Sequence, residues 1–139
     1  MALEKSLHFC NATSIIEDNN TVTLGNQRTF KATKNAWGDA STVSLGGSTF
    51  VAELTTTMTG AGTFKAVLTA NTTNTLVGGT QIAALHFPAA SIAGVIKRCT
   101  IPPGTAAGLS VGVVGVTGGA VTAGAINAYL TADKGQAAD

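Results

Sequence analysis

Residues 50–71 read FVAELTTTMTGAGTFKAVLTAN, and two limbs of alternating side chains flank a glycine-containing centre. The side chains that share the predicted inward parity are Phe50, Ala52, Leu54, Thr56 and Met58 in the first limb and Phe64, Ala66, Leu68 and Ala70 in the second. A two-residue period is typical of a β-strand with one buried face. Gly60 and Gly62 can adopt the positive φ that a short loop needs. The stretch predicts a long antiparallel hairpin whose Phe, Ala and Leu face points inward.

Short alternating segments, separated by Gly, Pro and Asn turns, continue on both sides of this stretch. The other expected strands are residues 3–16, 21–24, 80–87, 95–101, 109–117 and 121–130. Residues 29–33 are a further candidate strand, and residues 42–45 form either a loop or a short edge strand. The last two are expected to pair as a hairpin turned at Gly118–Gly119, and residues 89–94 are the only plausible helical turn. About eight strands with almost no helix predict one all-β domain over residues 1–139, an antiparallel sandwich or barrel. Residues 1–16 would form an N-terminal strand or arm, broken near residues 11–14, and residues 132–139 a loose C-terminal tail.

The composition is poor in charge and in aromatic side chains. Only 11% of residues are charged, against a usual ~25%, while 45% are apolar and 5% aromatic. The core must therefore be built from many small side chains. A formal net charge of +1 supplies neither a basic surface for nucleic acid nor an acidic tail. So little surface charge indicates that a partner covers part of the surface.

The cysteines and histidines form no recognisable metal-binding or disulfide pattern. Cys10 and Cys99 are far apart in the sequence, no CxxC occurs, and a domain of this size does not need a disulfide. His8 and His86 each lie alone in an apolar, strand-like context, which is more typical of a packed or edge residue than of a ligand. We expect no metal and no cofactor.

The opening residues and the most apolar tract both argue against export and membrane insertion. Residues 1–9, MALEKSLHF, are interrupted by charged and polar side chains, so no signal peptide is predicted. Residues 109–116 are far fewer than the ~20 needed for a membrane span, and they contain glycine. We expect a protein that is made and used without secretion.

The acidic residues offer no catalytic pair. Glu53 lies on the outward parity of the central stretch, Asp39 in a loop and Glu17–Asp18 on a turn, and a solvated or turn-capping role explains each. The glycine-rich residues 111–119 lack the Lys-Ser/Thr and the helix that follow a phosphate-binding loop. Phe30, the one aromatic between basic neighbours, makes no stacking platform for nucleic acid. We expect no catalytic residues and do not predict an enzyme.

A few large apolar and aromatic side chains are the candidates for contact with a partner. Trp37 lies in a glycine-bounded loop, where its ring either plugs one end of the core or anchors a partner. Trp37 and Tyr129 are also the obvious aromatic residues for contact with a sugar ring. The candidate contact residues are Leu3, Leu7, Phe9, Trp37 and Tyr129.

Six short motifs follow one another along the chain. They are residues 7–15 (LHFCNATSI), 24–25 (LG), 37–40 (WGDA), the stretch 54–68, 101–104 (IPPG) and 118–130 (GGAVTAGAINAYL). In this order the chain resembles the small capsid cement, or decoration, proteins of short-tailed bacteriophages, the jelly-roll type first met on a Bordetella phage. The resemblance spans most of the chain. The Arg- and aromatic-rich strand usual in that family is replaced here by residues 108–113, GLSVGV, so no contact position is carried over.

The resemblance implies a jelly-roll-like β-sandwich on the outer surface of a phage head, made in the bacterial cytoplasm. It implies two partners, namely the major capsid protein and other copies of the chain, as a dimer at twofold or local twofold positions or as a trimer. The role would be to clamp neighbouring capsid subunits against the pressure of packaged DNA, without direct contact with nucleic acid or membrane. A tail, fibre or glycan-binding β-sandwich module is the alternative.

Overall fold

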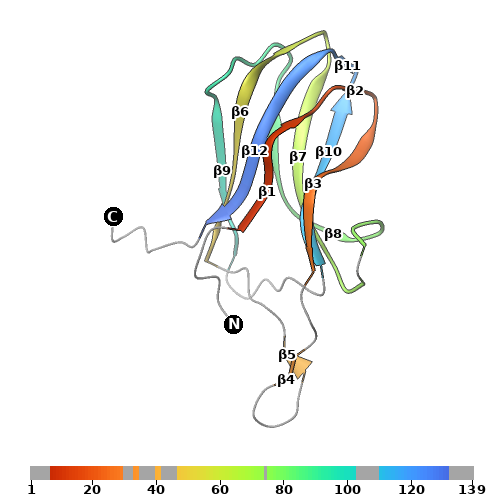
Figure 1. Ribbon diagram of the computed structural model, residues 1–139, viewed down its shortest axis with the longest axis vertical. Helices are drawn as coiled ribbons and strands as arrows, with labels where there is room; N and C mark the ends of the chain where they lie inside the picture. The colour runs from red at the N-terminus through yellow and green to blue at the C-terminus, as the bar shows by residue number, and fades with distance from the viewer. Residues whose placement is uncertain are drawn as a thin grey trace, which may run out of the picture.

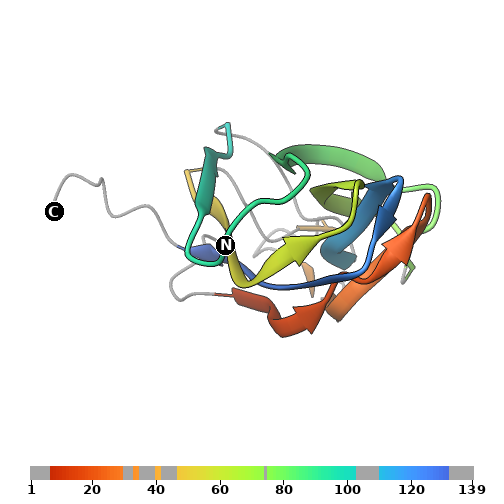
Figure 2. The same cartoon turned by 90° about the horizontal axis from the view of Figure 1, so that it is seen from above.

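Two antiparallel four-stranded sheets pack face to face in the computed structural model, which Figure 1 shows with its long axis vertical and Figure 2 shows from above. The structure describes residues 7–29, 33–34, 40–41, 47–73, 75–102 and 110–131. The strands are β1 (Leu7–Ser14), β2 (Glu17–Asp18), β3 (Thr21–Thr29), β4 (Thr33–Lys34), β5 (Ala40–Ser41), β6 (Thr49–Thr59), β7 (Thr63–Asn71), β8 (Thr80–Phe87), β9 (Ile96–Thr100), β10 (Ser110–Gly118), β11 (Ala120–Val121) and β12 (Ala123–Thr131). No helix occurs among these residues, so the prediction of an all-β sandwich is confirmed.

The chain crosses between the two sheets at nearly every connection. One sheet has the order β1-β12-β6-β9 and the other the order β3-β10-β7-β8, while β2 pairs with β11 and β4 with β5. Within the two main sheets, only β7 and β8 follow each other along the chain and pair directly. This alternation between layers gives the strand order of a jelly roll, as predicted.

The central stretch forms two strands, as predicted, but they are not a hairpin. β6 pairs with β12 and β9, while β7 pairs with β10 and β8, so the two lie in opposite sheets. The hairpin prediction is wrong because alternation tells which face of a strand is buried, not which strand lies beside it. The predicted hairpin at Gly118–Gly119 is wrong for the same reason, since the chain passes there from β10 in one sheet to β12 in the other.

The inner faces of the two sheets form one hydrophobic core. The inward side chains of β6 and β7 that are at most 1% exposed are Phe50, Ala52, Leu54, Met58, Phe64, Ala66 and Leu68. The rings of Phe64 and Phe87 lie 6.1 Å apart between centroids, within the range of favourable aromatic pairs. Thr56, on the predicted inward parity, is exposed because β6 shifts register against β12 near Ala125.

β1 continues over the residues where a break was predicted. Two register shifts against β12 fall within it, and Ala12 adopts a left-handed φ of 50°. The Ala12 backbone N–H donates to Asn127 Oδ1 at 2.7 Å, which helps to hold this unfavourable conformation. β3 similarly runs on through Gly25, whose φ is 62°, instead of ending there.

Residues 89–94 form turns and not the predicted helical turn. Hydrogen bonds attach them to β6: the Met58 N–H donates to the Ser91 carbonyl, and the Gly94 N–H to the Leu54 carbonyl, both at 2.8 Å. The strands predicted on either side are confirmed as β8 and β9. The predicted strands at 29–33 and 42–45 and the predicted tail at 132–139 lie largely or wholly outside the described residues.

Two turns press their backbones together at one end of the sandwich. The Gly62 N–H donates to the Ala120 carbonyl at 2.9 Å. A Cβ added to Gly62 would lie 2.6 Å from the carbonyl carbon and oxygen of Gly119. Because the obstacle is backbone, it cannot swing away as a flexible side chain would. Glycine is therefore required at position 62 by the available space.

Replacing Gly62 by alanine should lower the free energy of unfolding by about 1–3 kcal/mol, because the added methyl group forces the two turns apart. Chemical denaturation measures this loss. Gly118→Ala is the matched control, since its Cβ would meet only the Thr63 hydroxyl oxygen, at 3.0 Å. A loss below about 1 kcal/mol is expected for the control. Equal losses in the two variants would contradict this account.

Candidate functional site

Of the five predicted contact residues, the structure describes the side chains of Phe9 and Tyr129, and these point to opposite sides of their sheet. Tyr129 points outward from β12 and is partly exposed. Phe9 is 1% exposed and packs in the core, because it follows the outward-pointing His8 in the strand. The register shift after His8 leaves Cys10 buried beside it. The backbone of Leu7 lies in β1, while its side chain is outside what the structure describes. Leu3 and Trp37 also lie outside the described residues.

A row of side chains crosses the outer face of the β1-β12-β6-β9 sheet at Tyr129. The register places His8 opposite Tyr129, Tyr129 opposite Val51, and Val51 opposite Arg98. The rings of His8 and Tyr129 are tilted by 31°, with centroids 5.0 Å apart, so they lie in contact range. Val51 is only 3% exposed although it alternates with the inward residues Phe50 and Ala52.

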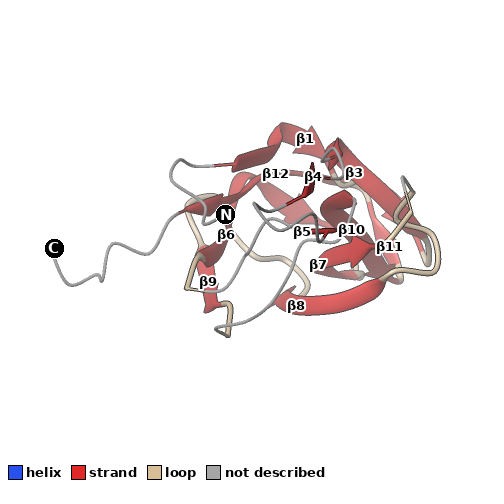
Figure 3. Ribbon diagram, turned by 90° about the horizontal axis from the view of Figure 1, so that it is seen from below, coloured by secondary structure: helices blue, strands red, loops and turns tan. Residues whose placement is uncertain are grey.

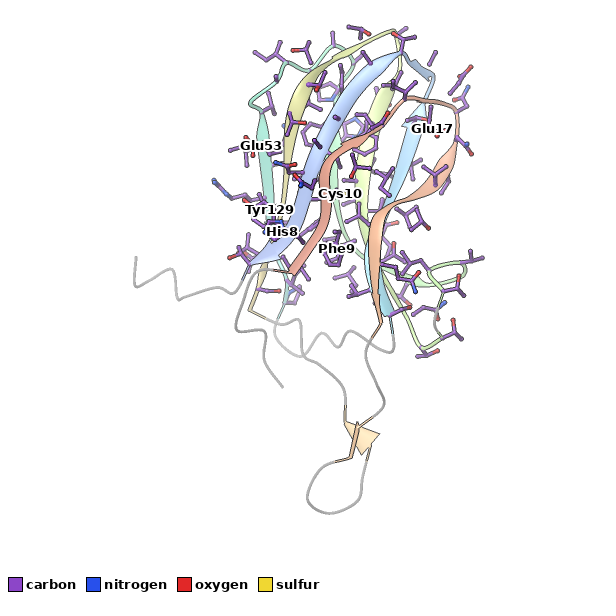
Figure 4. The ribbon with its side chains drawn as sticks, viewed as in Figure 1. His8, Phe9, Cys10, Glu17, Glu53 and Tyr129 are labelled. Atoms are coloured by element: carbon purple, nitrogen blue, oxygen red, sulfur yellow. The ribbon has the colours of Figure 1, made fainter. Side chains whose placement is uncertain are left out.

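The next row along the same face adds a carboxylate and an exposed apolar side chain. Asn127 lies opposite Glu53, and Glu53 opposite Ile96. Figure 4 shows His8 and Tyr129 side by side, with Glu53 further along the same sheet. We call this surface the Tyr129 face; its residues are His8, Val51, Glu53, Ile96, Arg98, Asn127 and Tyr129.

The Tyr129 face has the composition of a protein-contact surface. Tyrosine and arginine are enriched among the residues that dominate binding energy in protein interfaces. Such residues cluster where water is excluded, and Val51, in the middle of the row, is already shielded from solvent. Glu53 and Arg98 provide both signs of charge on one face. The outward position of Glu53 was predicted from the sequence. The positions of His8, Arg98 and Ile96 on the same face of the sheet were not predicted. Only the pairing of four strands distant in sequence brings them together.

The outer face of the other sheet carries a shallow depression of about 230 Å³. Its lining residues are Thr21, Lys65, Val67, Thr69, Leu76, Gly78, Gly79, Gln81, Val114 and Val116. Leu76, in the loop before β8, is 4% exposed and lies over Gly112, where an added Cβ would come within 2.8 Å of the leucine Cδ1. Gly112 thus provides the space in which this loop packs against the sheet.

Cys10 and Cys99 are both free thiols, and the topology keeps them apart. β1 and β9 are the two edges of one four-stranded sheet, three strand spacings from each other. At ~4.8 Å per spacing they are separated by roughly 14 Å, about twice the largest Cα distance that a disulfide tolerates. This separation is too large for a disulfide between them within one chain.

Cys10 is held in its protonated form. Burial raises the pKa of the Cys10 thiol to about 11, and a hydrogen bond with the Thr13 side chain lowers it by less. Since the thiolate is the reactive form of cysteine, this thiol is inert at neutral pH. Cys99, by contrast, is partly exposed.

No protein-family model matches this chain, and a search of the curated proteins finds no match. Within the described ranges, no three His, Cys, Asp or Glu side chains gather as a possible metal site. In the same part of the chain, no helix has the length and apolar character to cross a membrane.

The free energy of unfolding should fall as pH rises from about 9 to about 11, because the unfolded chain loses the Cys10 proton first. The stabilisation is complete below the thiol pKa of the unfolded chain, ~8.5, and is lost as pH passes the folded value. The full effect is about 3 kcal/mol, at ~1.4 kcal/mol for each pH unit between the two pKa values. Urea denaturation across this range measures it, and Cys10→Ala should lack this component of the slope. Identical slopes in the two proteins would contradict the raised pKa.

Proposed function

We propose that this protein is a structural cement, or decoration, protein that binds the outer surface of a tailed-phage head and clamps neighbouring major capsid protein subunits. The Tyr129 face is the observation that carries the proposal, because it offers a preformed contact surface on a rigid sheet. The order of motifs and the jelly-roll strand order both support it, since the resemblance to phage cement proteins implies this fold.

The Tyr129 face suits a protein partner with a flat surface. Its side chains stand on the paired strands β1, β12, β6 and β9, so little conformational freedom is lost on contact. The partly exposed Tyr129 and the exposed Ile96 supply apolar area, and Arg98 can form charge-assisted hydrogen bonds to a partner carboxylate. The face therefore combines apolar anchors with a directional polar contact.

Stabilisation of the shell would follow from mass action. A protein that binds the assembled head and not its separated subunits stabilises the head by its binding free energy at each site, ~2.7 kcal/mol at a free concentration of about 100 Kd. Many copies on one shell multiply this effect. No bond is made or broken in such a mechanism.

A glycan-binding module is the second candidate, because the Tyr129 ring is partly exposed and lies against His8. Aromatic faces of this kind can stack on sugar rings. Binding to a glycan array that Tyr129→Ala abolishes, together with no binding to phage heads, would favour this candidate.

Purified protein mixed with undecorated phage heads should sediment with them. Tyr129→Ala and Arg98→Ala should each weaken binding by about 2 kcal/mol, or roughly 30-fold in Kd, as is usual for dominant contact residues. Quantifying the bound fraction over a concentration series gives the Kd of each variant.

Lys65→Ala is the matched control for Arg98→Ala, since it removes a positive charge from the outer face of the other sheet. Its Kd should stay within about twofold of the unmodified protein. Failure of the unmodified protein to sediment with heads would overturn the proposed function. Equal losses for Lys65→Ala and Arg98→Ala would overturn the assignment of the Tyr129 face.

A further inference from the structure

Two long parts of the chain contain no charged residue, 66–96 and 99–132; in the second, the main strands β10 and β12 each lie between two other strands. All eight Lys and Arg residues and all seven Asp and Glu residues lie outside residues 66–96, which Lys65 and Lys97 bound. This segment runs from β7 through β8 to the start of β9. β8 lies at its centre and, among the strands that the structure describes, is paired with β7 alone. Figure 3 shows β8 along the rim of the sandwich.

Two exposed apolar side chains flank β8. Among the described residues, the large hydrophobic side chains with high exposure are Ile16, Val77, Ile92 and Ile96, and of these Ile96 belongs to the Tyr129 face. Val77 is 81% exposed just before β8, and Ile92 is 64% exposed just after it. We call residues 75–95 the β8 edge. An apolar side chain is therefore exposed at each end of this strand.

The β8 edge is already ordered in the single chain. The Asn71 side-chain amide donates to the Val77 carbonyl at 3.0 Å, which fixes the loop before β8. After β8, the Ser91 hydroxyl donates to the Pro88 carbonyl at 2.7 Å, and the backbone of this segment is bonded to β6. A partner would therefore bind a preorganised surface and lose little entropy in ordering it.

The other sheet edges carry features that discourage pairing with another strand, and β8 carries few of them. β9 has Lys97 and Arg98 within five residues. β1 is distorted by two register shifts, and β3 contains both a register shift and the left-handed Gly25. Charges and bulges of this kind are how natural sheets protect their edges. β8 has no charged residue, proline or glycine, and its register shift falls at Ile82, near its start.

We propose that β8 pairs with β8 of a second copy, antiparallel and around a twofold axis, so that two four-stranded sheets join into one sheet of eight strands. A surface without charge meets an identical surface without like-charge repulsion, whereas a charged partner would leave its charges unpaired. A twofold axis also presents the same strand from both copies, which is what an isologous interface requires.

The geometry of β8 selects a register for this pairing. In a twofold pair, residues on the same face must lie opposite each other, so the axis passes through one residue and its own copy. The regular part of the strand after the register shift is residues 83–87, whose centre is Leu85. This register extends the inner apolar face, because Ala83 meets Phe87 of the other copy. On the outer face, Ala84 of one copy lies opposite His86 of the other.

This inference deepens the proposed function, because it names the surface through which a cement protein would associate with itself. The two can fail separately. A monomeric protein that still binds heads would overturn this inference alone, and a β8-linked dimer that does not bind heads would overturn the proposed function alone.

Size-exclusion chromatography with light scattering should show a dimer of the full chain. Ala84→Lys should raise the dimer dissociation constant about tenfold or more, because it places a cation at the pairing edge. Ala61→Lys, the same substitution at an exposed position in the turn between β6 and β7, is the control and should leave the dimer intact. Both variants should keep the circular dichroism spectrum of the unmodified protein. A monomer at every concentration, or equal weakening by both substitutions, would overturn the proposal.

Cysteine cross-linking tests the register independently of affinity. A protein carrying Ala84→Cys and His86→Cys, with Cys99→Ala to remove the other accessible thiol, should form a covalent dimer under mild oxidation. Residues directly opposite on antiparallel strands lie ~4.5–5.5 Å apart between Cα atoms, which suits a disulfide. The same protein without His86→Cys should cross-link far more slowly, and equal rates would overturn the Leu85 register.

Discussion

The packing of β6 against β7 across the interior is the contact on which the rest of the structure depends. Because the chain passes from one layer to the other between these strands, Phe50 and Leu54 must be covered by side chains such as Phe64 and Leu68 from the opposite sheet. Small residues such as Ala52 and Ala66 allow the layers to interdigitate with little aromatic content. The close backbone contact at Gly62 follows, because the crossing turn must fit against its neighbour.

Once the inner faces are buried against each other, the two outer faces become free to differ. The β1-β12-β6-β9 sheet presents aromatic, cationic and anionic side chains around Val51. The other sheet presents mostly valine and threonine, and part of it is covered by the loop that carries Leu76. Val51 and Leu76 are both nearly inaccessible although neither belongs to the core between the sheets. Some apolar side chains on the outer faces are therefore shielded from water before any partner binds.

The residues on the inner faces could be predicted from the sequence, but their neighbours could not. The alternation around Phe50 and Phe64 correctly gave the buried parity, since a strand half buried in a sheet has a period of two. The same alternation fits a hairpin and a crossing between sheets equally well, so the pairing of β6 was mistaken. Tyr129, a predicted contact residue, is partly exposed, whereas Phe9, another of them, is buried because it alternates with the outward-pointing His8. A register shift buries Cys10 beside it, and local sequence does not report such shifts. The row from His8 to Arg98 joins residues ninety positions apart and emerges only from the strand order.

The Tyr129 face carries charged side chains and the β8 edge carries none, and the two surfaces lie on different sheets. Arg98 and Glu53 stand on the outer face of one sheet, while the uncharged β8 lies at the edge of the other, so a copy joined through β8 would leave the Tyr129 face open. Two copies joined in this way carry two such faces on one rigid unit. When both faces can reach a repeating lattice at once, the second contact is effectively intramolecular, and the pair binds more tightly than either copy alone. Modest affinity at each face would then be sufficient to hold the protein on a shell, which fits a chain with few charged and few aromatic side chains.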